Sequence, residues 1–288
     1  VYEIPLIYQK AGLPEIICQH FAMEQRDIDL TDWQVFLTNR AKAEGEITIA
    51  VCGKYVKHQD AYKSVGEALM HAAAGVKKKL NIKWIDSERS FIANDLEHEL
   101  AGIDGILTPG GFGVRGIEGK IAIAQYARER NIPLLGICLG MQVMAIEGVR
   151  NIGKLPDANS TEFDEMNPNP VIHLMEDQRY IDFVGASMRL GAYQCKLAEG
   201  SLARRAYGED VISERHRHRY EFNNAYRDTL REAGFNLSGV SLNDLLVEVI
   251  EYPQNDFYLG VQYHPEFKSR PNRPHPLFTE LIRAAAKK

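Results

Sequence analysis

Cysteine is scarce in this sequence, and its spacing excludes two ways of stabilising a small protein. The chain has 288 residues and four cysteines, which are far apart and form no CxxC pair or Cys/His cluster. Neither a disulfide framework nor a zinc site is therefore expected. The four are Cys18, Cys52, Cys138 and Cys195.

Long apolar runs and an excess of positive charge are also missing. No stretch approaches the roughly 18 apolar residues that span a bilayer, and no signal peptide opens the chain. The formal net charge of −5 argues against a nucleic acid or an anionic membrane as the main partner. With 45% hydrophobic residues the chain can fill a packed core, so we expect a globular protein in the cytoplasm.

Apolar segments from residue 45 onward predict strands and helices in alternation. The expected strands are 47–52, 82–85, 105–108 and 133–138, and the expected helices are 61–80, 117–130 and 139–147. This pattern is typical of an α/β fold with a largely parallel central sheet flanked by helices. Beyond residue 171 the segments predict antiparallel additions and a closing helix over 277–286.

Residues 1–44 are expected to be a lead-in segment, and residues 45–288 the functional domain. The lead-in mixes short apolar runs with charge and predicts one helix over 30–37, begun by a Thr31 or Asp32 cap. Because the chain starts with Val1 rather than Met, we expect a domain cut from a longer polypeptide.

A strand, a corner of small residues and a helix follow one another around Cys138. A nucleophile on such an elbow is exposed to a substrate, and Gly136 and Gly140 are expected to provide clearance. The helix N-terminus favours a thiolate, and the N–H of Leu139 could stabilise an oxyanion. The alternative, that Cys138 is an ordinary core cysteine, is less compatible with the two flanking glycines.

A base and a carboxylate follow late in the chain, at His264 and Glu266. Residues two apart on an extended segment point to the same side, so both side chains are expected to face the thiol, with Pro265 stiffening the link. Histidine could accept the thiol proton, and the carboxylate could orient the histidine.

The glycine string at 110–116 has two interpretations. It contains GxGxxG between an expected strand and an expected helix, which is the context of a dinucleotide-binding turn. However, the next strand ends in Cys138, where such folds place an acidic residue. The N–H of Gly111 could instead be the second donor of an oxyanion hole, opposite that of Leu139.

Two strings, GICLGMQ from Gly136 and HPE from His264, resemble the Cys-His-Glu triad of class I glutamine amidotransferases. Further strings resemble the glutaminase domains of the CTP synthase family, from about residue 47 to the C-terminus. They are GKY at Gly53, DAYKSV at Asp60, PGGFGVRG at Pro109, NSTEF at Asn159, MRLG at Met188, ERHRHRYE at Glu214 and HPEF at His264.

The resemblance implies hydrolysis of L-glutamine to glutamate and ammonia, with Cys138, His264 and Glu266 as the catalytic residues. It supports an oxyanion hole at Gly111 and Leu139, and it assigns Arg219 to the substrate carboxylate and Glu162 to the substrate ammonium. The full set of substrate-binding residues that it implies is Gly111, Leu139, Gly140, Met141, Gln142, Glu162 and Arg219. Residues 112–116, including Arg115, would form a lid that responds to GTP.

The resemblance also implies partners outside this sequence. ATP, Mg²⁺ and UTP would bind to an amidoligase domain that precedes the glutaminase, so no cofactor or metal is expected in this chain. The lead-in would be the tail of that domain plus a linker, and the full-length enzyme would be a homo-oligomer. The alternatives are another class I amidotransferase or a dinucleotide-binding module built on 110–116.

Overall fold

The computed structural model describes residues 1–56, 59–92, 95–174 and 188–288. Within them, one large sheet contains β1 (Glu46–Gly53), β2 (Lys79–Asp86), β3 (Gly105–Thr108), β4 (Leu134–Ile137), β7 (Arg189–Leu197), β8 (Val211–His218), β10 (Asn236–Ser241), β11 (Val247–Glu251) and β12 (Tyr258–Val261). A smaller sheet contains β5 (Ala158–Ser160), β6 (Asn169–Leu174) and β9 (Tyr220–Phe222).

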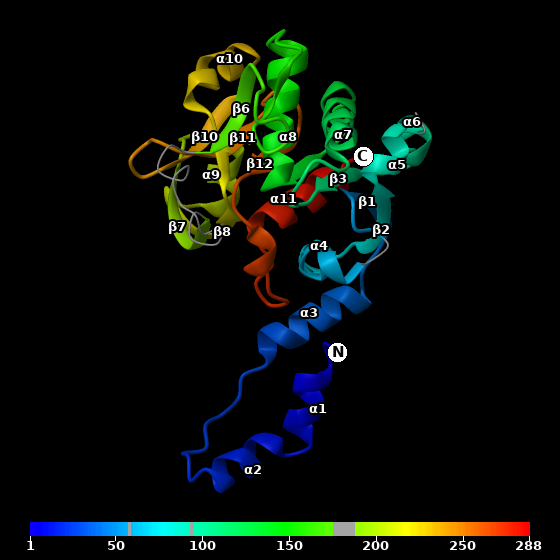
Figure 1. Cartoon of the computed structure of the whole chain (residues 1–288). Helices are drawn as coiled ribbons and strands as arrows, with labels where there is room; N and C mark the ends of the chain where they lie inside the picture. The colour runs from blue at the N-terminus through cyan, green and yellow to red at the C-terminus, as the bar shows by residue number, and fades with distance from the viewer. Residues whose placement is uncertain (57–58, 93–94, 175–187) are drawn as a thin grey trace.

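The large sheet has two halves that meet at β12 (Figure 1). Its strand order is β2-β1-β3-β4-β12-β11-β10-β7-β8. The strands from β2 to β12 are parallel, and β12, β11, β10, β7 and β8 pair in antiparallel fashion. The predicted α/β fold, with a parallel sheet flanked by helices and with antiparallel additions, is confirmed.

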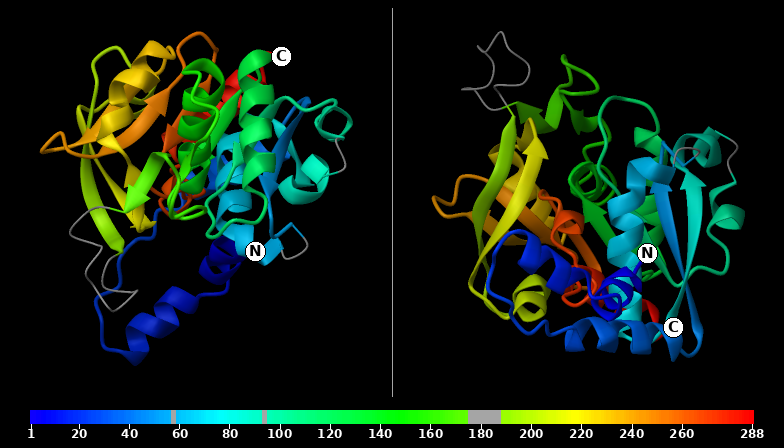
Figure 2. Two further views of the ribbon diagram at one scale, coloured as in Figure 1. Left: turned by 45° about the horizontal axis from the view of Figure 1, so that its top comes forward. Right: turned by 90° about the horizontal axis from the view of Figure 1, so that it is seen from below.

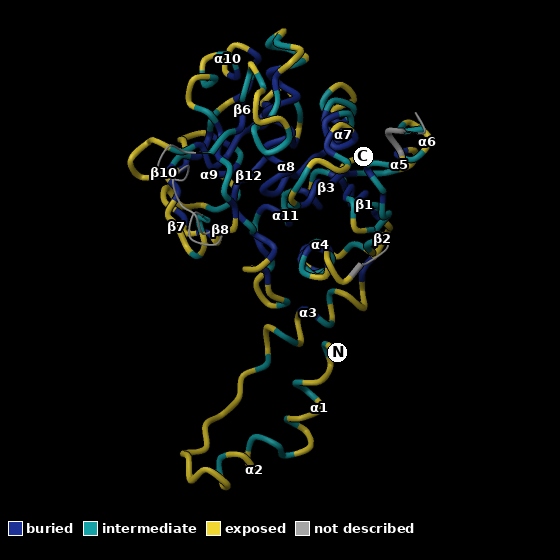
Figure 3. Tube along the Cα trace, viewed as in Figure 1, coloured by how far each residue is buried: buried dark blue, intermediate teal, exposed yellow. Residues whose placement is uncertain are grey.

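Helices cover both faces of the sheet. One layer contains α4 (Lys63–Gly75), α9 (Leu202–Tyr207) and α11 (Pro276–Ala285), and the other contains α7 (Ile117–Glu129) and α8 (Leu139–Glu147). Alternate side chains of a strand face opposite sides of the sheet. Along β1, Ile49 and Val51 therefore pack in the core beneath α4, α9 and α11, while Ala50 and Cys52 pack in the core beneath α7 and α8. The strands and the inner helix faces are buried (Figure 3).

Three shorter helices lie at the periphery. They are α5 (Ser87–Ile92), α6 (Leu96–Glu99) and α10 (Arg227–Glu232). Among the described residues no helix is long and apolar enough to cross a bilayer.

The N-terminal segment projects from the body of the domain (Figures 1 and 2). Neither α1 (Ile4–Lys10) nor α2 (Leu13–His20) contains a buried residue. Contact with the domain is made by α3 (Thr31–Ala41), which buries Phe36, and by Tyr2, whose ring packs against Phe36 and whose hydroxyl lies 3.0 Å from His71 Nε2 of α4.

Two of the helices predicted from the sequence, over 30–37 and 61–80, differ in detail from those in the structure. The helix predicted over 30–37 is α3, but Thr31 and Asp32 lie inside it, and Asp29 Oδ1 accepts the N–H of Thr31 at 2.8 Å. The helix predicted over 61–80 ends at Gly75, because the chain reverses through Lys77 at φ 58° and enters β2. Gly75 stands at the end of the helix, but the residue that adopts the positive φ is Lys77.

Candidate active site

Cys138 occupies the corner between β4 and α8, as predicted, with φ 54° and ψ −106°. A positive φ is uncommon for a residue with a side chain and is typical of strained functional positions. The N–H of Cys138 donates to Val261 O at 2.7 Å, and its carbonyl accepts from Gln142 N at 3.2 Å. The corner is therefore held by the neighbouring strand β12 and by the first turn of α8.

The glycines beside Cys138 serve the packing of the protein more directly than access for a substrate. A Cβ on Gly140 would lie 2.2 Å from Thr108 O, and one on Gly136 would lie 2.4 Å from Met144 Sδ. Both glycines therefore allow α8 to lie directly against β3 and β4. This contact, rather than the clearance expected from the sequence, is what the structure requires of them.

His264 and Glu266 lie beyond the end of β12, and they do not form the extended segment that was predicted. Residues Pro265–Phe267 form a single 3₁₀ turn. The turn still brings the two side chains together, with His264 Nδ1 and Glu266 Oε1 2.7 Å apart. The N–H of His264 donates to Arg215 O at 2.8 Å, which anchors the base to β8.

Cys138 and His264 both lie against Gly110. A Cβ on this glycine would lie 3.1 Å from His264 Cε1 and 3.5 Å from Cys138 Cβ. Burial lowers the pKa of His264, but the neighbouring Cys138 and the hydrogen bond to Glu266 raise it more, so its pKa is above the ordinary value. A histidine in this state is suited to pair with a thiolate.

A cavity of about 400 Å³ opens beside the sulfur. Its lining includes five residues selected from the sequence, namely Gly111, Cys138, Gln142, Glu162 and Arg219. It also includes Phe112, Met188, Arg217, His218 and Tyr220, which were not selected. The structure thus brings together residues from the glycine loop, the elbow, and the β5–β6 and β8–β9 connections.

Leu139, Gly140 and Met141 do not belong to the described lining of this cavity. The side chains of Leu139 and Met141 are buried in the core beside α7. Any role for these residues therefore falls to their backbone N–H groups at the start of α8, which have no intrahelical acceptor.

The glycine loop is held by charged side chains on both sides. Lys120 Nζ donates to Pro109 O at 2.8 Å, Lys54 Nζ donates to Phe112 O, and Glu162 Oε1 accepts from Gly113 N at 2.7 Å. A phosphate cradle would present backbone N–H groups, and that of Gly113 is already bonded to a carboxylate. Burial raises the pKa of Glu162, although Gly113 N–H, Lys54 and Arg219 oppose the rise.

Arg115 lies at the edge of this loop and not in the lining of the cavity. Its Nε is 3.5 Å from Glu88 Oε2, and its Nη2 donates to Lys54 O at 3.5 Å. Both contacts are partly exposed to solvent.

The histidines of the β8 region form a buried neutral pair. His218 Nδ1 faces Tyr220 O at 3.1 Å and must donate to it, so His218 Nε2 accepts from His216 Nδ1 at 2.9 Å. Burial, together with the charge of Arg189, lowers the pKa of His216 to about 2 and that of His218 to about 3. The alternating burial of β8 also places Arg215 and Arg217 on its exposed face.

Metal ligands do not cluster in the part of the chain that the structure describes. No group of three or more histidine, cysteine, aspartate or glutamate side chains there could hold an ion.

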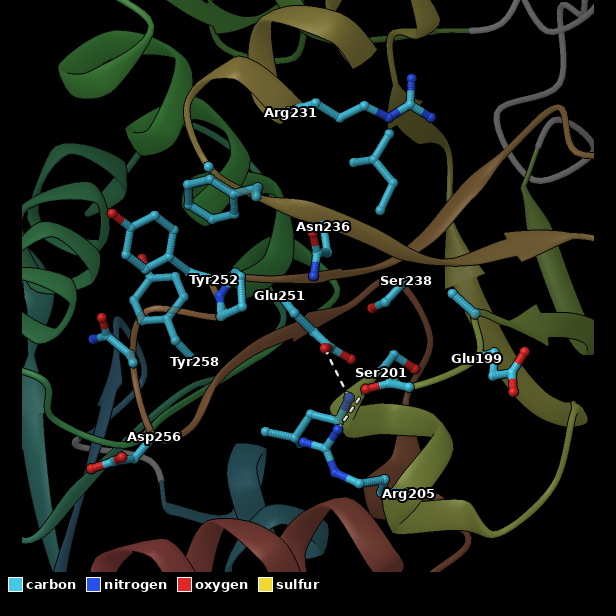
Figure 4. Close-up of a pocket in the computed structure, with 18 residues that line it drawn as sticks. Glu199, Ser201, Arg205, Arg231, Asn236, Ser238, Glu251, Tyr252, Asp256 and Tyr258 are labelled. Atoms are coloured by element: carbon cyan, nitrogen blue, oxygen red, sulfur yellow. Dashed lines mark hydrogen bonds between the residues drawn. The ribbon is translucent and has the colours of Figure 1, made fainter.

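A larger pocket of about 890 Å³ lies away from the triad, around the start of α9 (Figure 4). Its polar groups are used in local structure: Glu251 accepts the N–H groups of Leu202 and Ala203 at 2.9 and 2.8 Å, and Ser201 accepts that of Arg204. Neither Cys138 nor His264 lines it, so we assign the active site to the smaller cavity.

The family model for glutamine amidotransferase class-I matches residues 57–284. The chain therefore belongs to the class I glutamine amidotransferase family.

Among its relatives, the CTP synthase of Thermosynechococcus vestitus is 50% identical over 287 residues, which are 100% of this chain and 53% of that protein. The CTP synthase of Nostoc punctiforme is 51% identical, covering 99% of this chain and 52% of that protein. The chain thus spans about half the length of these curated relatives.

A solved structure of the Trypanosoma brucei CTPS glutaminase domain with bound acivicin superposes with a TM-score of 0.79 at 41% identity. The match covers 84% of this chain and 94% of that one. The similarity to CTP synthases that the sequence motifs indicated is thus found in both sequence and fold.

Proposed function

We propose that this chain hydrolyses the side-chain amide of L-glutamine to glutamate and ammonia, as the glutaminase part of a CTP synthase. The observation that carries the proposal is the left-handed corner that holds Cys138 beside the His264–Glu266 pair, at the wall of the 400 Å³ cavity. A nucleophile, a base and an orienting carboxylate in contact are the components of acyl transfer.

In the first half of the reaction, Cys138 Sγ attacks the carboxamide carbon of glutamine after its proton passes to His264. The N–H groups of Gly111 and Leu139 donate to the developing oxyanion. His264 then gives the proton to the departing ammonia, which leaves a thioester. In the second half, His264 takes a proton from water, the hydroxide attacks the thioester, and glutamate leaves as the thiol is restored.

The amino-acid end of glutamine would lie between Glu162 and Arg219, which line the cavity together with Gln142. Glu162 is already hydrogen-bonded to Gly113 N, and a carboxylate oxygen can accept more than one hydrogen bond. Binding of the substrate ammonium to Glu162 would therefore also affect the glycine loop, because the same carboxylate holds Gly113 N–H.

The ammonia would serve the amination of UTP in an amidoligase domain that uses ATP and Mg²⁺. This proposal is supported by the relatives, which are named CTP synthase and are about twice as long as this chain. In the same proposal, residues 1–44 connect that domain to the glutaminase at 45–288. GTP would act on residues 112–116, with Arg115 as a contact.

The test is the intact mass of the protein after incubation with acivicin, an electrophilic probe that is bound in the T. brucei structure. We expect a single adduct that maps to Cys138 and is absent from Cys138→Ala. Cys52 and Cys195 are internal controls because both are fully buried, and Cys18 is the partly exposed control. Equal labelling of Cys18 and Cys138, or no adduct, would contradict a glutamine-recognising nucleophile.

A further inference from the structure

Gln262 is a buried amide directly beside the nucleophile. It lies between the end of β12 and His264, and no part of its surface is exposed to solvent. Its backbone N–H donates to Glu248 O of β11 at 2.9 Å. A glutamine that is fully buried requires hydrogen-bond partners for both ends of its amide.

The orientation of this amide follows from its neighbour Gln142. Tyr220 O can only accept, so the nitrogen of Gln142, 3.1 Å away, must face it. The same nitrogen is 3.1 Å from the side chain of Gln262, so the atom of Gln262 that it meets must be the oxygen.

The nitrogen of Gln262 is then left to face Cys138. Gln262 Nε2 lies 3.7 Å from Cys138 Sγ, within the range of an N–H···S hydrogen bond. The contact directs an amide hydrogen at the atom that attacks the substrate. The sequence showed no sign of it, because Gln262 precedes the HPE string and its partners come from distant parts of the chain.

We propose that Gln262 is a further catalytic residue, whose amide N–H donates to the sulfur of Cys138, favours the thiolate and holds it in position for attack. The inference rests on the proposed function in that Cys138 must be the nucleophile. A hydrogen bond to the charged form of a group stabilises that form. Because Gln142 also lines the cavity, the same network connects the substrate-facing wall to the sulfur.

Among the described residues, His264 and Lys120 are titratable groups that interact electrostatically with Cys138, and the test leaves both in place. His264 lies beside the sulfur across Gly110, and the Lys120 ammonium approaches from α7. If substitution of Gln262 changes the pH at which the thiolate forms, the change is therefore due to loss of the Gln262 amide.

The experiment measures the rate of alkylation of Cys138 by iodoacetamide as a function of pH, by intact mass, in wild type and Gln262→Met. Iodoacetamide is small and does not need the glutamine site, so its reaction reports the thiolate directly. We expect the midpoint of the pH dependence to move upward by about one pH unit in Gln262→Met, since one unit is the typical size of a single lost interaction. The kcat for glutamine hydrolysis should fall while KM changes little.

Tyr263→Phe is the matched control, because Tyr263 is adjacent, equally buried and bonded through its hydroxyl to Tyr207 at 3.2 Å rather than to the sulfur. It should leave the midpoint unchanged. If Gln262→Met does not fold by circular dichroism, Gln262→Glu decides, since its carboxylate would face the sulfur and should move the midpoint at least as far.

An unchanged midpoint in a folded Gln262 variant would overturn the proposal and leave Gln262 a structural residue, even if kcat falls. Failure of the proposed function has a different signature. In that case acivicin would not label wild-type Cys138, whatever the iodoacetamide profiles show.

Discussion

His264 titrates as part of a unit with Cys138 and Glu266, and its raised pKa reflects both neighbours. Glu266→Gln removes the charge of Glu266, so the pKa of His264 should fall. The imidazolium would then lose its proton at lower pH, and the alkaline limb of the kcat/KM profile should move in that direction. We expect kcat to fall by about 10²- to 10⁴-fold, the usual contribution of a positioned acid–base group.

Rates of glutamate release measured across the pH range would check this expectation. Glu280→Gln is a suitable control, because Glu280 pairs with Arg283 on the surface of α11. An alkaline limb that stays in place in Glu266→Gln would show that the carboxylate does not control the charge of His264.

Lys120 is a buried cation whose burial lowers its pKa to about 8, and Lys54 adds to this effect. Between about pH 8 and about pH 10.4, the unfolded chain holds a proton on this lysine that the folded protein has lost. The contribution of Lys120 to stability should therefore rise with pH across this window. Relative to Lys120→Met, the wild type should gain on the order of 2–3 kcal/mol.

Urea unfolding of both proteins at several pH values would measure the difference, in which the titration of other groups cancels. A difference that does not vary with pH would mean that the Lys120 ammonium is solvated in the folded state.

At the scale of elements, the contact of α8 with β3 depends on the absence of a side chain at Gly140. Gly140→Ala would place a methyl group 2.2 Å from Thr108 O, a backbone atom in a central strand. We expect a loss of at least about 2 kcal/mol of unfolding free energy, as overpacking usually costs. Catalysis should also fall, since the helix carries the N–H of Leu139.

Gly66→Ala in α4 is the matched control, because its nearest neighbour would be Ile82 Cδ1 at 3.8 Å. Alanine is the better helix former, so this variant should gain roughly 0.5–1 kcal/mol. Denaturant unfolding of both variants checks the pair, and equal stabilities would contradict the close approach of α8 to β3.

The elements nearest Cys138 could be predicted almost to the residue, and others could not. The elbow and α8 are marked by an apolar run, two glycines and an uninterrupted helical segment. The end of α4 was predicted too late although Gly75 stands there, because the positive φ of the reversal is adopted by Lys77, a conformation that lysine rarely adopts. The turn after His264 was also missed, since Pro265 is compatible with extended and 3₁₀ backbone alike.

The chemistry of the site was predictable where it depends on residue type, and less so where it depends on contacts across the fold. Cys138, His264 and Glu266 stand in short strings whose resemblance to the family triad predicts their roles. Lys120 and Gln262 do not, because their contacts with Pro109 O and Cys138 Sγ are made only by tertiary packing.

At the scale of the whole molecule, the first 30 residues add exposed apolar surface and are tied to the domain through Tyr2. Their exposed apolar side chains are Val1, Ile4, Ile7, Tyr8, Ile16, Ile17, Phe21, Met23 and Ile28. Deletion of residues 1–30 should lower the free energy of unfolding by about 1–2 kcal/mol, because it retains Phe36 but removes the Tyr2 ring that packs against it. It should also reduce self-association, since exposed apolar patches promote it.

Urea unfolding and sedimentation velocity would measure the two effects. Deletion of residues 1–44 is the comparison, because it also removes Phe36 and should cost about 1.5–3 kcal/mol more. A large loss on the shorter deletion would show that α1 and α2 are integral to the domain.

The position of β12 has a consequence for the order in which the chain can assemble during synthesis. The strands β2, β1, β3 and β4 are complete at Ile137, and β11, β10, β7 and β8 are complete at Glu251. The two groups are joined by β12, which is made after both and is inserted between β4 and β11. Since His264 and Glu266 follow it directly, the proposed base can reach Cys138 only as the sheet closes.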